Sequence, residues 1–141
     1  NALAIAVPPG NPAGIASLTD LAGPNVTVVV CARQVPCGAA ATALFEQNSL
    51  DVRPVSLEAD VRAVLTKVIA DEADAGIVYR TDITSAGTDV EGITISDAQN
   101  VSTTYPIATT TGAGPDAQTF VDFVLSDDGQ EILDLWGFTR L

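Results

Sequence analysis

Apolar residues fall along the chain in short runs, each closed by glycine, proline or small polar residues. Such runs predict buried strands, because a strand needs only about four to eight apolar residues between turn signals. We expect strands at 2–7, 26–31, 52–55, 75–79, 90–95 and 105–110. The segment 90–95 alternates polar and apolar residues, which is typical of an edge strand.

Helical spacing occupies the stretches between these strands. In the clearest case, a helix that follows Asp60, apolar residues at 61, 64, 65, 68 and 69 share one face. Further helices are expected at 17–23, 39–48 and 80–87, after Pro115, and from Ser126 to Gly137. Strands that alternate with helices favour an α/β fold with a largely parallel sheet.

Composition narrows the classes of function. The chain has 141 residues, 47% of them apolar, which is enough for a domain with a real core. Eighteen acidic and six basic residues give a net charge of −12, which disfavours nucleic acid as a partner. Histidine is absent, and with it the commonest metal ligand and general base. We therefore expect no metal centre, no cofactor and no enzymatic activity.

The stretch Cys31–Gly38 is the centre of the predicted site. A β-branched strand enters it and a helix-forming segment leaves it, so it holds a tight turn and a helix start. A helix start offers amide groups without internal partners and the positive end of the helix dipole, which together bind anions. In an exported protein Cys31 and Cys37 would form a disulfide across this turn; in a cytosolic protein they would be two buried thiols.

Three hydrogen-bond donors are expected at the carboxyl ends of neighbouring strands, where α/β proteins bind their ligands. They are the amide of Cys37 in the turn Pro36–Gly38, the amide of Val61 after the capping residue Asp60, and the hydroxyl of Tyr79. A tetrahedral oxyanion presents only acceptor oxygens, so converging uncharged donors suit it. The alternative interpretation is that each helix start meets its own cap or water and that the tyrosine only packs.

Five motifs in order resemble the periplasmic molybdate-binding proteins, the solute receptors of molybdate ABC importers. They are Pro8-Pro-Gly-Asn-Pro-Ala-Gly14, Val35-Pro-Cys-Gly38, Glu58-Ala-Asp-Val-Arg62, Asp74-Ala-Gly-Ile-Val-Tyr79, and Gly129-Gln-Glu-Ile132 with Trp136-Gly-Phe138. The resemblance implies that Cys37, Val61 and Tyr79 hold molybdate or tungstate by hydrogen bonds. It also implies an ABC permease as partner and an extracytoplasmic location, in the periplasm or at the cell surface, where a lipid anchor would hold the receptor.

The same resemblance implies the two-lobed type II periplasmic-binding-protein fold, of which this chain matches the second half. Residues 1–104 would form the second lobe, and residues 105–141 would be a crossover strand and C-terminal helices that return to the first lobe. The family's first segment, which supplies serine donors, precedes the matched part. We therefore expect an apolar face that this N-terminal segment or a second copy covers, formed by Phe120, Phe123, Leu133 and Trp136.

Two other functions are compatible with the sequence. A receptor of this kind could bind another tetrahedral oxyanion such as sulfate, and the effector-binding domain of a LysR-type regulator shares the bilobal fold. Glu58 and Asp60 could be mistaken for a catalytic carboxylate pair, but two acids at a helix start are explained by capping and the helix dipole. Arg33 and Arg62 lie near the predicted site as surface charges that would raise the association rate of an anion.

Overall fold

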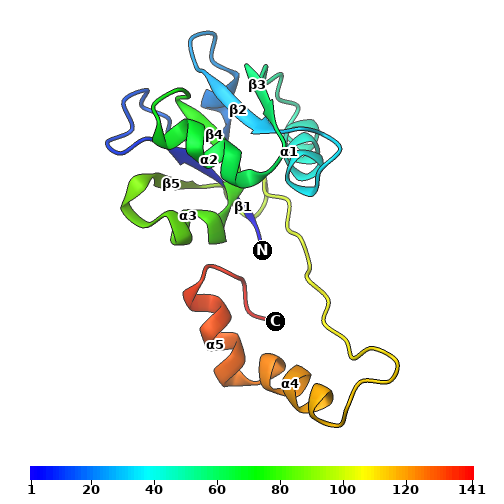
Figure 1. Ribbon diagram of the computed structural model, residues 1–141. Helices are drawn as coiled ribbons and strands as arrows, with labels where there is room; N and C mark the ends of the chain where they lie inside the picture. The colour runs from blue at the N-terminus through cyan, green and yellow to red at the C-terminus, as the bar shows by residue number, and fades with distance from the viewer.

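The computed structural model describes all residues, 1–141, and is organised around one five-stranded sheet (Figure 1). The strands are β1 (Leu3–Val7), β2 (Val28–Cys31), β3 (Ser56–Glu58), β4 (Ala75–Tyr79) and β5 (Glu91–Thr94). They lie side by side in the order β3-β2-β4-β1-β5. Strands β1, β2 and β4 are buried along their whole length, which explains their continuous apolar sequences.

The directions of the strands place several chain ends at one edge of the sheet. Strand β2 pairs in parallel with β3 and β4, whereas β1 pairs antiparallel with β4 and β5. Four strands therefore point the same way and β1 alone is reversed, which confirms the predicted α/β fold with a largely parallel sheet. Because β1 is reversed, its amino end lies at the same edge as the carboxyl ends of β2, β3 and β4.

Two of the helices beside the sheet, α1 (Pro36–Gln47) and α2 (Val61–Ile69), begin at residues that favour a helix start. The third is α3 (Arg80–Ala86), and the short 3-10 turns are η1 (Leu18–Ala22) and η2 (Gly87–Asp89). Helix α1 starts at Pro36, three residues before the predicted start, because proline is well suited to a first helical turn. Asp60 caps α2 as predicted, since its carboxylate accepts a hydrogen bond from the Ala63 amide at 2.9 Å.

Helices α1 and α2 cover opposite faces of the sheet. Successive residues of a strand point to opposite faces, and β3 shows the consequence. Leu57 lies by a hollow that Phe45 of α1 also lines, whereas the neighbouring Ser56 bonds to Lys67 of α2. Helix α2 packs closely on the sheet because β4 carries Gly76, where a Cβ would lie 2.6 Å from a side-chain atom of α2.

Two strand predictions are wrong. Residues 52–55 form no strand, because the residues that pair with β2 are Ser56–Glu58, and Pro54 has no amide to donate to a ladder. Residues 105–110 form neither strand nor helix. They run past the end of the sheet unit without a neighbouring strand to pair with, and Tyr105 and Ile107 are exposed. The apolar residues of this segment therefore do not make it a strand, because no partner strand is available.

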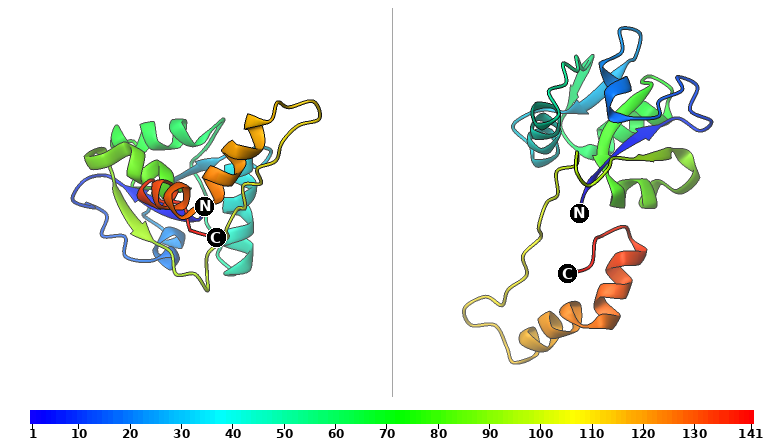
Figure 2. Two further views of the ribbon diagram at one scale, coloured as in Figure 1. Left: turned by 90° about the horizontal axis from the view of Figure 1, so that it is seen from below. Right: turned by 180° about the vertical axis from the view of Figure 1, so that it is seen from behind.

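The C-terminal helices lie apart from the sheet (Figures 1 and 2). An extended segment leads to α4 (Asp116–Leu125) and α5 (Asp127–Leu135), which pack on each other. After α5 the chain approaches the sheet unit again, where Phe138 meets the Tyr105 ring edge-on at 5.6 Å and Gly137 lies beside Arg80 of α3. None of the helices has both the length and the apolar character needed to cross a bilayer.

The apolar face expected on these two helices is largely open. Phe120 is 61% exposed, Phe123 48% and Trp136 56%, whereas Leu133 is half-buried. The residues of the sheet unit therefore do not bury Trp136.

Candidate functional site

The carboxyl edge of the sheet holds the turns in which the predicted donors lie. Cys31 ends β2, Glu58 ends β3 and Tyr79 ends β4, on three adjacent parallel strands. Cys31 and Glu58 are paired in register, and the next amide, that of Ala32, donates to the Glu58 carbonyl at 2.8 Å. Since neighbouring strands lie about 4.8 Å apart, the turns that follow them open side by side.

The turn after β2 presents the amide of Cys37. The Val35 carbonyl accepts hydrogen bonds from the amides of Gly38 and Ala39, both at 3.0 Å, while the Cys37 amide donates to no group of the chain. The turn is close-packed, because a Cβ at Gly38 would lie 2.0 Å from the Ala32 carbonyl oxygen. The predicted disulfide between Cys31 and Cys37 is confirmed, with their Cα atoms 5.7 Å apart.

The turn after β3 presents the amide of Val61 in the same way. The Asp60 carboxylate accepts a hydrogen bond from the Ala63 amide at 2.9 Å, and the Asp60 carbonyl accepts one from the Val64 amide at 3.4 Å. Val61 is the first residue of α2, and its amide has no acceptor within the chain. Two helix starts at one edge therefore each leave a free amide, at the positive end of a helix dipole.

Tyr79 contributes a buried ring at the end of β4. Burial, chiefly, raises the pKa of its hydroxyl above the ordinary value, and the neighbouring Tyr105 acts in the same direction. The hydroxyl therefore keeps its proton at neutral pH and can donate a hydrogen bond. It lies beside Thr103 and Tyr105, at the point where the chain leaves the sheet unit.

Two acidic side chains at this edge, Asp82 and Glu58, take part in hydrogen bonds within the chain. Burial raises the pKa of the Asp82 carboxyl, and two opposing effects are the hydrogen bond from the Tyr79 amide, at 2.8 Å, and the positive charge of Arg62. Hydrogen bonds from Lys67, foremost, and from Ser56 hold the pKa of Glu58 below its usual range. The sequence did not single out Asp82 or Lys67, since their roles depend on contacts between separate elements.

The chain enters and leaves the sheet unit at this same edge. Ala2 and Ser102 form an isolated bridge, and the Thr103 amide donates to the Asn1 carbonyl at 2.8 Å. The Ala2 carbonyl in turn accepts from the Arg80 amide at 2.9 Å. Segments outside residues 2–102 therefore start from the edge that carries the predicted donors, and α4 and α5 lie on this side in Figure 2.

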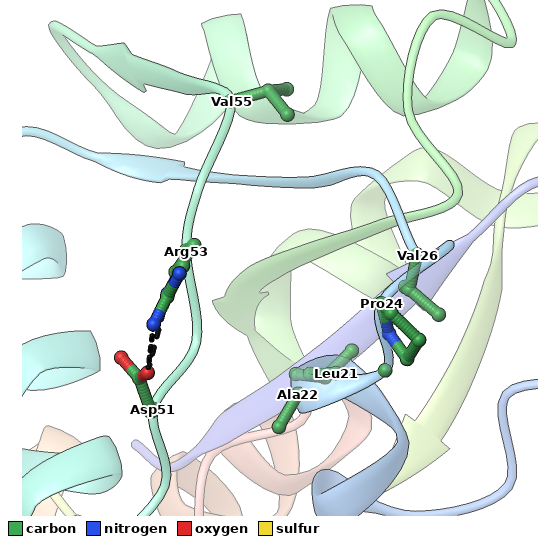
Figure 3. A pocket seen from close by; sticks show the side chains of 8 residues that line it. Leu21, Ala22, Pro24, Val26, Asp51, Arg53 and Val55 are labelled. Carbon is green, nitrogen blue, oxygen red and sulfur yellow. Dashed lines mark hydrogen bonds and ion pairs between the residues drawn. The ribbon is translucent and has the colours of Figure 1, made fainter.

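A separate hollow of about 450 Å³ lies at the opposite edge (Figure 3). It is lined by residues of η1 and by residues that precede β2 and β3: Leu21, Ala22, Gly23, Pro24, Val26, Asp51, Arg53 and Val55. Its ion pair, between Arg53 and Asp51 at 2.8 Å, is solvent-exposed. Because these residues come before the parallel strands begin, this hollow does not contain the predicted donors.

Comparisons with known proteins identify relatives over nearly the whole chain. The family described as bacterial extracellular solute-binding protein matches residues 1–139. The chain is 39% identical over 142 residues to the molybdate-binding protein ModA of Mycobacterium tuberculosis and of Mycobacterium bovis. It is 26% identical over 148 residues to a putative ABC transporter substrate-binding lipoprotein, YvgL, of Bacillus subtilis. The matches cover 99% of this chain but only 54% and 55% of these relatives, so it spans about half their length.

Solved structures share the fold. The substrate-binding domain of a putative molybdenum ABC transporter from Clostridium difficile superimposes with a TM-score of 0.83 at 23% identity, over 100% of this chain and 64% of that one. The L-phospholactate complex of PEB3, a Campylobacter jejuni protein, gives 0.86 at 20% identity, over 99% and 65%. The type II periplasmic-binding-protein fold is thereby confirmed.

The resemblance to molybdate-binding proteins that the motifs indicated is also confirmed. The relatives are solute-binding proteins and not enzymes, and their names, which include an extracellular family and a lipoprotein, suggest an extracytoplasmic location. The match over residues 1–139 decides the classification. This chain belongs to the bacterial extracellular solute-binding protein family.

Proposed function

We propose that this chain forms the second lobe and the returning C-terminal segment of a receptor that captures molybdate or tungstate for an ABC importer. The observation that carries the proposal is the pair of unpartnered amides, Cys37 and Val61, on adjacent turns at the carboxyl edge, with the hydroxyl of Tyr79 on the next strand. The similarity to ModA supports this choice of ligand.

The donors select their ligand by hydrogen-bonding character. A fully deprotonated dianion accepts at every oxygen, whereas phosphate near neutral pH retains a proton that needs an acceptor. Sulfate has the right charge but is smaller, so some donors would be left poorly satisfied, at about 1–3 kcal/mol for each buried group. Molybdate and tungstate are nearly equal in size, and we propose that the site accepts both.

A full-length receptor would complete the site from its first lobe. The curated relatives are nearly twice as long as this chain, and its ends leave the sheet unit at the edge of the candidate site. In this proposal residues 1–104 are one lobe and residues 105–141 belong with the other. The N-terminal segment of that other lobe covers Phe120, Phe123, Leu133 and Trp136, because an open apolar face of this kind marks an interface.

The receptor would act outside the cytoplasm. The relatives include an extracellular family and a lipoprotein, and we propose a lipid-anchored or periplasmic receptor that docks on an ABC permease after its lobes close on the anion. Disulfides form and persist in the oxidising environment outside the cytoplasm, so the Cys31–Cys37 disulfide agrees with this location.

Calorimetric titration of the complete receptor tests the proposal. Molybdate, tungstate, sulfate and L-phospholactate are titrated in turn, the last because the PEB3 structure contains it. We expect tight binding of molybdate and tungstate with similar affinity, and sulfate weaker by at least tenfold. Preference for sulfate or L-phospholactate would show that the receptor serves another oxyanion, and binding of none of the four would contradict the proposal.

A further inference from the structure

Three polar side chains form a closed cluster between β3 and α2. The Lys67 ammonium donates to the Ser56 hydroxyl at 2.8 Å and pairs with Glu58 Oε1 at 2.7 Å, while the Ser56 hydroxyl donates to the same carboxylate oxygen. The side chain of Glu58 is 14% exposed, so this ion pair is better shielded than the four others in the structure. Lys67 is the only lysine of the chain.

The cluster lies next to the candidate anion site. Glu58 is the last residue of β3 and pairs in register with Cys31. Val61, whose amide is free, follows three residues later, so at most about 11 Å of chain separates the two residues. A full negative charge on Glu58 would therefore act on an anion bound at the Val61 amide across roughly one Debye length, where screening is only partial.

Lys67 removes this charge conflict without entering the site. Its positive charge compensates the carboxylate, and the hydrogen bonds hold the carboxylate on the side of the sheet that α2 covers. Two neighbouring acids, Asp60 and Asp82, accept hydrogen bonds from the amides of Ala63 and Tyr79 instead of forming an ion pair. The cluster also ties the three-residue edge strand β3 to the helix whose first amide is the donor.

We propose that Lys67 is a positioning residue for oxyanion binding: it acts through Glu58, whose negative charge it neutralises from outside the site. The inference rests on the proposed function, since it concerns an anion at the amides of Cys37 and Val61. It assigns a role in binding to an ion pair that lies between β3 and α2, outside the turns that carry the free amides.

The test compares four variants of the complete receptor by calorimetric titration with molybdate. Lys67→Met keeps the aliphatic stem and removes the charge, and we expect its dissociation constant to rise about three- to tenfold. Lys67→Arg keeps the charge and should restore most of the affinity. The double variant Glu58→Gln/Lys67→Met removes both charges and should bind within about twofold of the unmodified receptor. Arg53→Met removes a positive charge at the opposite edge and should leave the affinity unchanged.

Each result bears on the inference. If Lys67→Met binds as tightly as the unmodified receptor, or if the double variant stays as weak as Lys67→Met, the inference is wrong. A loss in Arg53→Met equal to that in Lys67→Met would also contradict it, because the effect would then be one of total charge. If the unmodified receptor binds no oxyanion, the proposed function itself is wrong, and this outcome is distinct from an effect of the Lys67 variants. Thermal unfolding of each variant checks that all four are folded.

Discussion

At the scale of single residues, the proposed recognition by main-chain amides would leave the side chains of Cys37 and Val61 free for other tasks. Cys37 uses its side chain in a disulfide and Val61 uses its own in packing against the core. Neither side chain is polar, yet both residues present an amide at the same edge of the sheet. Substitutions that move the main chain at these residues should therefore weaken anion binding more than substitutions that only change the polarity of a side chain.

Replacing Gly38 by alanine should damage the site through the backbone. The added Cβ would lie 2.0 Å from the Ala32 carbonyl oxygen and 2.6 Å from that of Cys31, so the turn must shift. We expect a loss of about 1–3 kcal/mol in the free energy of unfolding, measured by urea denaturation, together with weaker molybdate binding. Gly114→Ala is the matched control, because nothing lies within 4 Å of its Cβ position. Equal stability of the two variants would contradict the described turn.

Replacing Tyr79 by phenylalanine should remove one donor and little else. The ring and its burial at the end of β4 are kept, so the variant of the complete receptor should fold normally. We expect molybdate binding to weaken by about 1–2 kcal/mol, the contribution of one hydrogen bond to a charged ligand. Calorimetric titration measures this, and an unchanged affinity would remove Tyr79 from the site.

At the scale of elements, the turn between β2 and α1 is held by its disulfide as well as by hydrogen bonds. Cys31 and Cys37 are six positions apart, and a closed loop of this size stabilises a fold by roughly 2 kcal/mol through the unfolded chain. We expect Cys31→Ala/Cys37→Ala to lose about this much in urea denaturation. Adding a reductant should lower the midpoint of the unmodified chain but not that of the variant. An unchanged midpoint in both cases would contradict a stabilising role.

The start of α3 should respond to pH through Asp82. Burial raises the pKa of this carboxyl in the folded chain, so the folded chain binds more protons and loses stability as pH rises between the unfolded and folded pKa values. Asp82→Asn keeps an oxygen that can accept from the Tyr79 amide. We therefore expect the variant to be the more stable chain at pH 7, with the difference vanishing in acid. Urea midpoints at both pH values measure this, and a less stable variant at pH 7 would contradict it.

An element could be predicted from the sequence where its local pattern of apolar residues agreed with its long-range pairing in the sheet. Residues 75–79 are both apolar and central in the sheet, so pattern and position agreed. Residues 52–55 were also apolar, but Pro54 and the pairing of Ser56 with Val29 moved the strand along the chain. The turn at Cys37 could be predicted because a strand and a helix start adjoin it. The pairing of Glu58 with Lys67 could not, since it joins two elements through side chains.

At the scale of the whole molecule, α4 and α5 carry an apolar face that the sheet unit leaves open. Trp136, the only tryptophan of the chain, is 56% exposed there. We expect its fluorescence to resemble that of a solvated indole in the 141-residue chain and to shift to shorter wavelength in the complete receptor, where the first lobe would cover it. Comparison with Trp136→Phe isolates its signal from other tryptophans. The same emission in both contexts would contradict the assignment of 105–141 to the other lobe.

Two amides and one hydroxyl that meet a single small dianion are the centre of the proposed recognition. The most direct measurement is an NMR titration of the isotope-labelled complete receptor with molybdate, in which individual amide signals are followed. We predict that the amide protons of Cys37 and Val61 move downfield together and saturate at the same molybdate concentration, because each gains an anionic acceptor. If these two signals stay in place while amides elsewhere in the receptor respond, the anion binds at another site and the proposed recognition is wrong.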